Sequence, residues 1–111
     1  MIDNKEYMDV DNALSRIGGN VALYKKLLNY YLNDNHIDAL SAALENGNIE
    51  DASRLAHTIK GVCANLSLNK LRAVALELET CIKGGQDHAD LLVSLKQTFE
   101  ETSKVIKDYA S

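Results

Sequence analysis

Apolar residues recur at intervals of three and four along almost the whole chain, which is the spacing of one buried face of an α-helix. Clusters of glycine and asparagine interrupt this spacing at residues 18–20, 45–48 and 84–85, where they indicate turns. The pattern predicts a short helix over residues 10–17, a long one from residue 21 to about 44, a third over 49–65, a fourth that starts at Ser67 or Asn69 and ends at Gly84, and a last one over 87–109. The segment NDNH, residues 33–36, favours a bend or restart inside the long helix.

Four long helices joined by short turns are typical of an antiparallel up-down-up-down bundle. We therefore predict an all-α fold: a four-helix bundle with a short extra N-terminal helix over one end. A length of 111 residues predicts a single domain that spans 1–111. The residues expected to face the core are Val21, Tyr24, Leu27, Leu28, Tyr31, Ile37, Leu40, Leu44, Ala52, Leu55, Ala56, Ile59, Cys63, Leu66, Leu71, Val74, Ala75, Leu78, Ile82, Leu92, Leu95, Phe99, Thr102 and Ile106.

Charge and hydropathy argue against several classes of function. With 12 basic and 16 acidic side chains the net charge is −4, which disfavours binding to nucleic-acid phosphates. No run approaches the roughly 20 apolar residues that span a bilayer, and the N-terminus lacks the basic-then-apolar order of a signal peptide. The two cysteines fit a reducing compartment and match no zinc spacing with the three histidines. We expect a cytoplasmic protein with no metal and no direct membrane contact.

The third predicted helix carries an unusual polar face. At about 100° per residue, His57 lies roughly 160° from the centre of the apolar stripe, so its side chain is expected in solvent. Gly61 follows one turn later, although glycine inside a helix costs about 1 kcal/mol relative to alanine. The other neighbours of His57 on this face are Ser53, Arg54, Lys60 and Ala64. Small residues therefore clear space beside the imidazole, and the surface of another protein can approach it.

An exposed imidazole suits phosphoryl transfer, because it is mostly neutral at pH 7 and offers a lone pair to phosphorus. Lys60, at i+3, can place its ammonium beside the phosphoryl oxygens, where negative charge spreads in the transition state. Arg54, at i−3, can assist at longer range. Neither an exposed histidine nor the pattern H-x-x-K-G is specific alone. The hypothesis depends on their occurrence together with small flanking residues in an all-helical chain.

Residues 56–79, AHTIKGVCANLSLNKLRAVALELE, resemble the signature of histidine phosphotransfer (HPt) domains of multistep phosphorelays, most closely those attached to hybrid sensor kinases. Residues 8–34 are similar to the lead-in of the same family, in which a short helix and a Gly-Gly turn precede a long helix. The resemblance implies that His57 accepts the phosphoryl group, that Lys60 supports it and that Gly61 makes room for the partner. The chain departs from the pattern in having Ala64 and Ser67 where many members have glycine, and Arg72 where many have glutamine. Serine is a fair cap at a helix junction, and Arg72 would supply a second cation.

The resemblance implies a histidine phosphotransfer module of two-component signalling. A response-regulator receiver domain, phosphorylated on an aspartate, docks on the His57 face, and Nε2 of the imidazole attacks phosphorus in line. The group then passes from His57 to another receiver domain. Members of the family are phosphoryl-transfer intermediates without ATP-dependent kinase activity of their own, and this chain has no G-x-x-x-x-G-K-[ST] loop. The Mg²⁺ that the transfer requires sits in the receiver domain, so no cofactor is expected here.

The implied partners are receiver domains and a hybrid sensor histidine kinase, and the chain itself is expected to be a monomer. It would act in the cytoplasm, either free-standing or as the cytoplasmic C-terminal part of a membrane-anchored sensor kinase. The residues expected to contact the partner are Ser53, Arg54, Gly61, Ala64, Arg72 and Leu76. On the helical wheel Leu76 and Tyr30 both point partly outward.

Two other functions stay open at this point. The histidine-bearing domain of a chemotaxis-type kinase shares the H-x-x-K-G core but receives its phosphoryl group from an ATP-binding domain. A catalytically inert helical adaptor would keep its activity after a His57→Gln substitution. Cys63 and Cys81 are expected to be small buried apolar residues, and His36 and His88 to be caps or bystanders.

Overall fold

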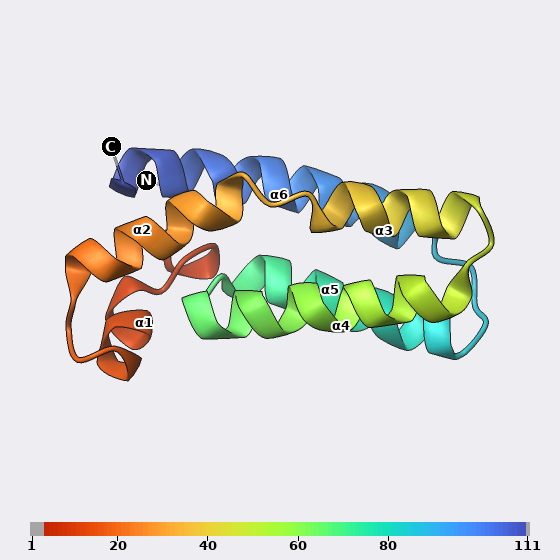
Figure 1. Cartoon of the computed structure of the whole chain (residues 1–111), viewed down its shortest axis with the longest axis horizontal. Helices are drawn as coiled ribbons and strands as arrows, with labels where there is room; N and C mark the ends of the chain where they lie inside the picture. Colours follow the sequence, from red (N-terminus) through yellow and green to blue (C-terminus); the bar gives the residue numbers. More distant parts are fainter. Residues whose placement is uncertain (1–3, 111) are drawn as a thin grey trace.

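The computed structural model of the chain describes residues 4–110, and all of their regular secondary structure is helical (Figure 1). A 3₁₀ turn, η1 (Asn4–Glu6), precedes a short helix, α1 (Val10–Arg16). The longer helices are α2 (Val21–Leu32), α3 (His36–Glu45), α4 (Ile49–Leu66), α5 (Asn69–Lys83) and α6 (Ala89–Ala110). The predicted all-α fold is therefore confirmed.

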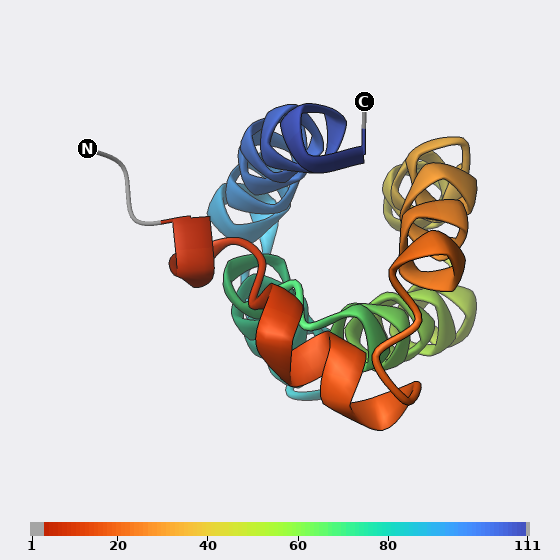
Figure 2. The same cartoon turned by 90° about the vertical axis from the view of Figure 1, so that its left-hand side faces the viewer.

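The long helices form four antiparallel legs. The first leg consists of α2 followed by α3, the second is α4, which returns beside α3, and the third is α5, which runs antiparallel to α4 (Figure 1). The fourth leg, α6, packs against α5 and α2. Figure 2 shows α1 across the end of the bundle where α4 finishes and α5 begins. This confirms the predicted bundle with its short extra N-terminal helix.

The first leg breaks at residues 33–35, inside the segment where a bend or restart is predicted. Asn33 ends α2, and its side-chain amide donates a hydrogen bond to the carbonyl oxygen of Asn29 at 2.9 Å. The Asp34 carboxylate accepts a hydrogen bond from the backbone N–H of His36 at 2.9 Å, and the same oxygen lies 2.5 Å from His36 Nδ1. Asn35 is the N-cap residue of α3, and the Asp34 side chain binds the first backbone N–H of that helix.

The core lies between the legs and includes most of the predicted residues. Tyr24, Leu28, Leu40, Ile59, Cys63, Leu71, Leu78, Leu95, Thr102 and Ile106 are fully buried. Leu44, Leu55, Val74, Leu92 and Phe99 are partly buried and pack against the core.

The prediction is wrong for Val21 and Leu27, which are 42% and 39% exposed. Val21 is the first residue of α2, and Leu27 lines a groove between α2 and the C-terminal half of α4. The reason is that α2 packs mainly against α6 and touches α4 only lightly, so the flank of α2 that faces α4 stays open. Tyr30, on the same flank, is 81% exposed, and its predicted outward direction is confirmed.

Ser67 ends α4 and does not start α5, which corrects one of the two predicted starts of that helix. Its backbone lies in the left-handed region with φ of 55°, which is uncommon for a residue other than glycine. The chain then leaves α4 through Leu68, and α5 begins at Asn69. A left-handed C-cap explains physically why glycine is an alternative at this position, because glycine adopts that conformation without steric cost.

The N-terminal part of the chain satisfies the carbonyl groups that α4 leaves open at its end. The Arg16 guanidinium donates to the carbonyl oxygens of Ala64 and Asn65, the second at 3.1 Å. The Tyr24 hydroxyl donates to Leu66 O at 2.7 Å. At Ser67, the carbonyl accepts from Asp9 N–H at 3.0 Å and the hydroxyl donates to Asn12 Oδ1 at 2.8 Å. These bonds attach α1 and α2 to the C-terminus of α4, where helical carbonyls otherwise lack partners.

Substitutions at Ser67 should separate backbone strain from hydrogen bonding. Ser67→Ala keeps the left-handed strain and loses the hydroxyl bond to Asn12, so we expect a loss of about 1 kcal/mol in the free energy of unfolding. Ser67→Gly loses the same bond but relieves strain of about 1 kcal/mol, so its stability should stay close to that of the wild type. Urea unfolding followed by circular dichroism measures both. A glycine variant as unstable as the alanine variant would contradict the explanation.

Candidate functional site

Helix α4 presents His57 to solvent on the side opposite the core. Ala56 and Ile59, its neighbours on the buried face, are fully buried, whereas the His57 side chain is 67% exposed. The start of the helix is capped by Asn48, whose side chain accepts a hydrogen bond from Asp51 N–H at 3.3 Å. The imidazole therefore stands on a well-anchored helix, in the direction that the helical wheel predicts.

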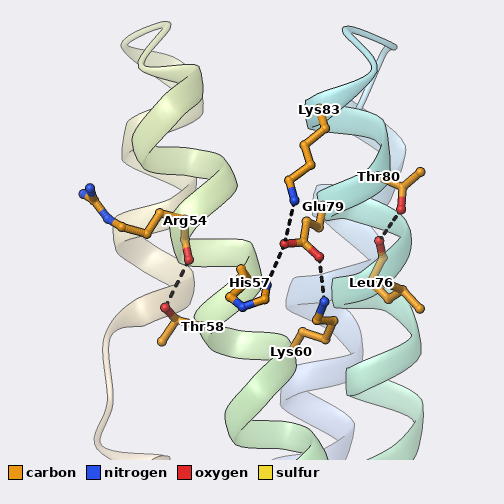
Figure 3. Close-up of polar contacts among 8 residues, drawn as sticks. All are labelled: Arg54, His57, Thr58, Lys60, Leu76, Glu79, Thr80 and Lys83. Carbon is orange, nitrogen blue, oxygen red and sulfur yellow. Dashed lines mark hydrogen bonds and ion pairs between the residues drawn. The ribbon is translucent and has the colours of Figure 1, made fainter.

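A buried carboxylate on the neighbouring helix holds this imidazole. Glu79 of α5 has a side chain only 5% exposed, and its Oε2 lies 2.9 Å from His57 Nδ1 (Figure 3). Its other oxygen, Oε1, accepts a hydrogen bond from Lys60 Nζ at 2.9 Å. A second ammonium, that of Lys83 on the next turn of α5, lies 3.4 Å from Oε2. One carboxylate thus joins a histidine and two lysines from two helices.

The charge state of Glu79 follows from these contacts. Burial acts to raise the pKa of the Glu79 carboxyl, but the hydrogen bonds from Lys60 and His57 and the positive charges of Lys60 and Lys83 lower it. The lowering effects prevail, and the pKa lies below its ordinary value. Glu79 is therefore an ionised carboxylate at neutral pH, and a carboxylate only accepts hydrogen bonds.

The carboxylate determines which nitrogen of His57 carries the proton. Because Oε2 of Glu79 accepts, Nδ1 of the neutral imidazole must be the N–H donor. The lone pair then belongs to Nε2, and the geometry of the ring directs it away from α5. Figure 3 shows Nδ1 turned towards Glu79 and the second ring nitrogen on the far side. The arrangement offers an oriented nucleophilic nitrogen on an exposed surface.

The residues predicted to surround His57 on α4 differ from one another in their exposure and contacts. Lys60 is only 25% exposed and is held by Glu79, so its ammonium is fixed close to the imidazole. Ser53 and Ala64 are half-buried on α4. A Cβ placed on Gly61 would meet no atom within 4 Å, so no contact inside the described chain requires glycine there.

The cations predicted to assist lie further away or are paired elsewhere. Arg54 is exposed and forms an ion pair with Asp51 at 2.5 Å. Arg72 lines a hollow with Arg16, Ala64 and three asparagines, two turns of α5 or roughly 10 Å along the axis before Glu79. The structure brings Lys83, not Arg72, to the carboxylate. Leu76, one turn before Thr80 on the same helix, is 43% exposed, as its place on the wheel predicts.

Sequence reasoning missed Glu79 and Lys83, although the chain contains a signal for the first. Glu79 lies four residues after Ala75 and three before Ile82, so it falls within the apolar stripe of α5. A carboxylate in register with buried residues is rarely tolerated unless it is paired. The pairs Lys60–Glu79 and His57–Glu79 join residues 19 and 22 apart, and only the antiparallel packing of α4 on α5 brings them together.

The remaining candidates have other roles. Cys63 is buried beside the Tyr31 hydroxyl, 3.6 Å away, and burial raises the pKa of its thiol to about 12. Cys81 is half-buried and is also a free thiol. Within residues 4–110, no group of three or more potential metal ligands comes together. No helix in this part of the chain combines the length and the apolar composition needed to cross a bilayer.

Acidification is expected to remove the contribution of Glu79 to stability. Its pKa in the folded protein lies below the ordinary 4.5, so the ion pairs act fully above that pH and are lost as the pH falls below it. Urea unfolding should show that the stability of the wild type relative to a Glu79→Gln variant is greater at pH 7 than at pH 3. Equal differences at the two pH values would show that the ionised carboxylate does not stabilise the fold.

Comparison with known proteins places the site in a family. The model of the Hpt domain family matches residues 32–105, which cover more than half of the chain and include α3, α4, α5 and most of α6. A search of curated proteins and a search of solved structures gave no match. The matched region contains His57, Lys60, Glu79 and Lys83. The chain thus belongs to the Hpt domain family, whose members act in histidine phosphotransfer within phosphorelays.

Proposed function

We propose that His57 accepts a phosphoryl group from the phosphorylated aspartate of a receiver domain and passes it to the aspartate of another receiver domain. The observation that carries this proposal is the His57–Glu79 contact of 2.9 Å, which fixes the proton on Nδ1 and leaves the lone pair on exposed Nε2. Family membership supports a phosphotransfer role, and the geometry supplies the nucleophile.

In the transfer, Nε2 of His57 attacks phosphorus in line and a P–N bond forms while the P–O bond to the aspartate breaks. The leaving group is the aspartate carboxylate of the receiver domain. The transition state spreads negative charge over the phosphoryl oxygens, so a nearby cation stabilises it. Lys60 supplies this cation, because Glu79 holds its ammonium one helical turn from the ring. The Mg²⁺ that assists the reaction belongs to the receiver domain.

The partner approaches over the face of α4 that contains Gly61. Gly61 lies one turn after His57 with open space beside it, and Arg54 on α4 and Leu76 on α5 are also exposed. Beyond Gly61, an apolar groove between α2 and α4 is lined by Leu27, Tyr30, Tyr31, Val62 and Leu66 together with polar residues. Val62 and Leu66 follow His57 by five and nine residues, so the groove lies on a different side of α4 from the imidazole.

The wider setting is part of the same proposal and rests on the resemblance of the sequence to HPt domains of hybrid kinases. The chain acts as a monomer in the cytoplasm, either free-standing or as the C-terminal part of a membrane-anchored hybrid sensor kinase. In each arrangement the donor is a receiver domain and not ATP. A chemotaxis-type kinase domain would instead take its phosphoryl group from an ATP-binding domain, so the identity of the donor decides between the two.

Substitution of His57 should abolish acceptance of the phosphoryl group. Incubation with a phosphorylated receiver domain is expected to label the wild type with a phosphate that is stable in base and labile in acid, and His57→Gln should stay unlabelled. His88→Gln is the matched control, because His88 lies at the start of α6 outside the site, and it should be labelled as the wild type is. Label on the His57→Gln variant would show that the nucleophile is another residue.

Removal of the Lys60 ammonium should slow transfer without unfolding the protein. We expect Lys60→Ala to reduce the rate of transfer roughly ten- to hundredfold, because one charge-stabilising group is lost from the transition state. Lys104→Ala on α6 changes the net charge equally, is exposed, and should leave the rate unchanged. Circular dichroism should show the same helix content for all three proteins. A slow Lys60 variant that has also lost helix content would instead indicate a structural role.

A further inference from the structure

The contact between Glu79 and His57 has a consequence for the phosphorylated form of the protein. Glu79 binds the ring nitrogen opposite the one that takes the phosphoryl group, and its side chain is 5% exposed, so water cannot readily take its place. Both carboxylate oxygens are engaged, one by His57 and one by Lys60. Phosphorylation of Nε2 on the exposed side of the ring leaves the Nδ1 side enclosed as before.

The charge of the imidazole ring before and after phosphorylation shows why the proton on Nδ1 matters. A neutral imidazole that attacks through Nε2 keeps its proton on Nδ1, so the product is a cationic ring that carries the phosphoryl group. This ring can lose the Nδ1 proton to water and become a neutral phosphoimidazole. If it does, onward transfer to an aspartate would have to release an anionic imidazolate or take up a proton first. If the proton stays on Nδ1, the ring leaves as a neutral imidazole when the new P–O bond forms.

We propose that Glu79 keeps Nδ1 of His57 protonated while the phosphoryl group is on Nε2, so that the group leaves again without uptake of a proton. This inference rests on the proposed function, because it assumes that His57 is the acceptor. A carboxylate fits the task, since it accepts a hydrogen bond from N–H and repels a bare nitrogen lone pair. Glu79 is in this sense a positioning residue that acts through the ring and does not touch phosphorus.

Other charged groups near the ring modify this effect. Lys60 and Lys83 contact Glu79 and favour loss of the proton, whereas the phosphoryl group favours its retention. Arg54, on the same helix as His57, is paired with Asp51. The other charged or titratable residues on α4 and on the helices packed against it are Tyr24, Lys25, Lys26, Tyr30, Tyr31, His36, Asp38, Glu45, Glu50, Cys63, Lys70, Arg72, Glu77 and Cys81. Within residues 4–110, Glu79 is the carboxylate that lies within ion-pair distance of the ring.

The test uses a variant that keeps the hydrogen bond and removes the charge. The glutamine of Glu79→Gln can accept from Nδ1–H or donate to a bare Nδ1, so it has no preference for the proton. Both proteins are phosphorylated with phosphoramidate, which needs no partner domain, and ¹⁵N NMR follows the protonation of Nδ1 against pH. We expect the pH of half protonation of the phosphorylated ring to fall by about one unit or more in the variant.

The substitution should also change the lifetime of the phosphohistidine. The cationic ring is the better leaving group, so the phosphoryl group of Glu79→Gln should hydrolyse roughly tenfold more slowly at pH values above both midpoints, where a one-unit shift changes the protonated fraction tenfold. Glu79→Ala should shift both quantities in the same direction and provides a second variant if the glutamine protein does not fold. A purely structural role of Glu79 would leave the midpoint unchanged.

Glu77→Gln provides the matched control. It makes the same substitution two residues earlier on α5, at an exposed position, and should leave the midpoint and the lifetime as in the wild type. An equal shift in both variants would show that net charge causes the effect. No shift in Glu79→Gln would overturn the inference and leave the proposed function standing, because labelling of His57 by a phosphorylated receiver domain tests that function separately. If a phosphorylated receiver domain leaves His57 unlabelled, the proposed function fails and the inference loses its premise.

Discussion

The site depends on one buried carboxylate at the contact between α4 and α5. Glu79 lies among apolar residues of α5, where an unpaired charge would be costly, and it is tolerated because His57 and Lys60 of α4 and Lys83 of its own helix surround it. The same contacts that satisfy Glu79 also orient the imidazole and fix a lysine beside it. Stability and chemistry therefore impose the same requirement on the register between the two helices.

Much of the architecture follows from periodicity, and the exceptions have physical causes. Helical spacing and turn residues predict every leg of the bundle, the break at residues 33–36 and the outward direction of His57. Spacing cannot say which neighbouring helix covers a given helix face. For that reason the predicted core includes Val21 and Leu27, which lie on α2 and are exposed. The role of Ser67 was missed because a left-handed C-cap normally signals itself by glycine.

The residues of the candidate site also fall into two groups: some can be predicted from the sequence, and others depend on how the helices pack. His57, Lys60 and Gly61 lie on one helix, so their relation is visible in the sequence. Glu79 and Lys83 lie on the next helix, and their approach to His57 depends on the angle and register of packing. A charged residue within the apolar stripe of α5 was the available signal, but acidic residues are read as exposed by default. Arg72 was expected near the site by resemblance, and the structure places it in a separate hollow.

The hydrogen bonds at the C-terminus of α4 show that residues before the family match belong to the same structural unit as His57. The helix that carries His57 ends at carbonyl groups that accept hydrogen bonds from Asp9, Arg16 and Tyr24, all of which precede residue 32. The family match begins only at residue 32, after α1 and nearly all of α2. A fragment trimmed to the matched region would contain every residue of the site but would leave the end of α4 to fray into water. The boundaries of the family model are thus narrower than the smallest piece of this chain that holds its histidine helix in place.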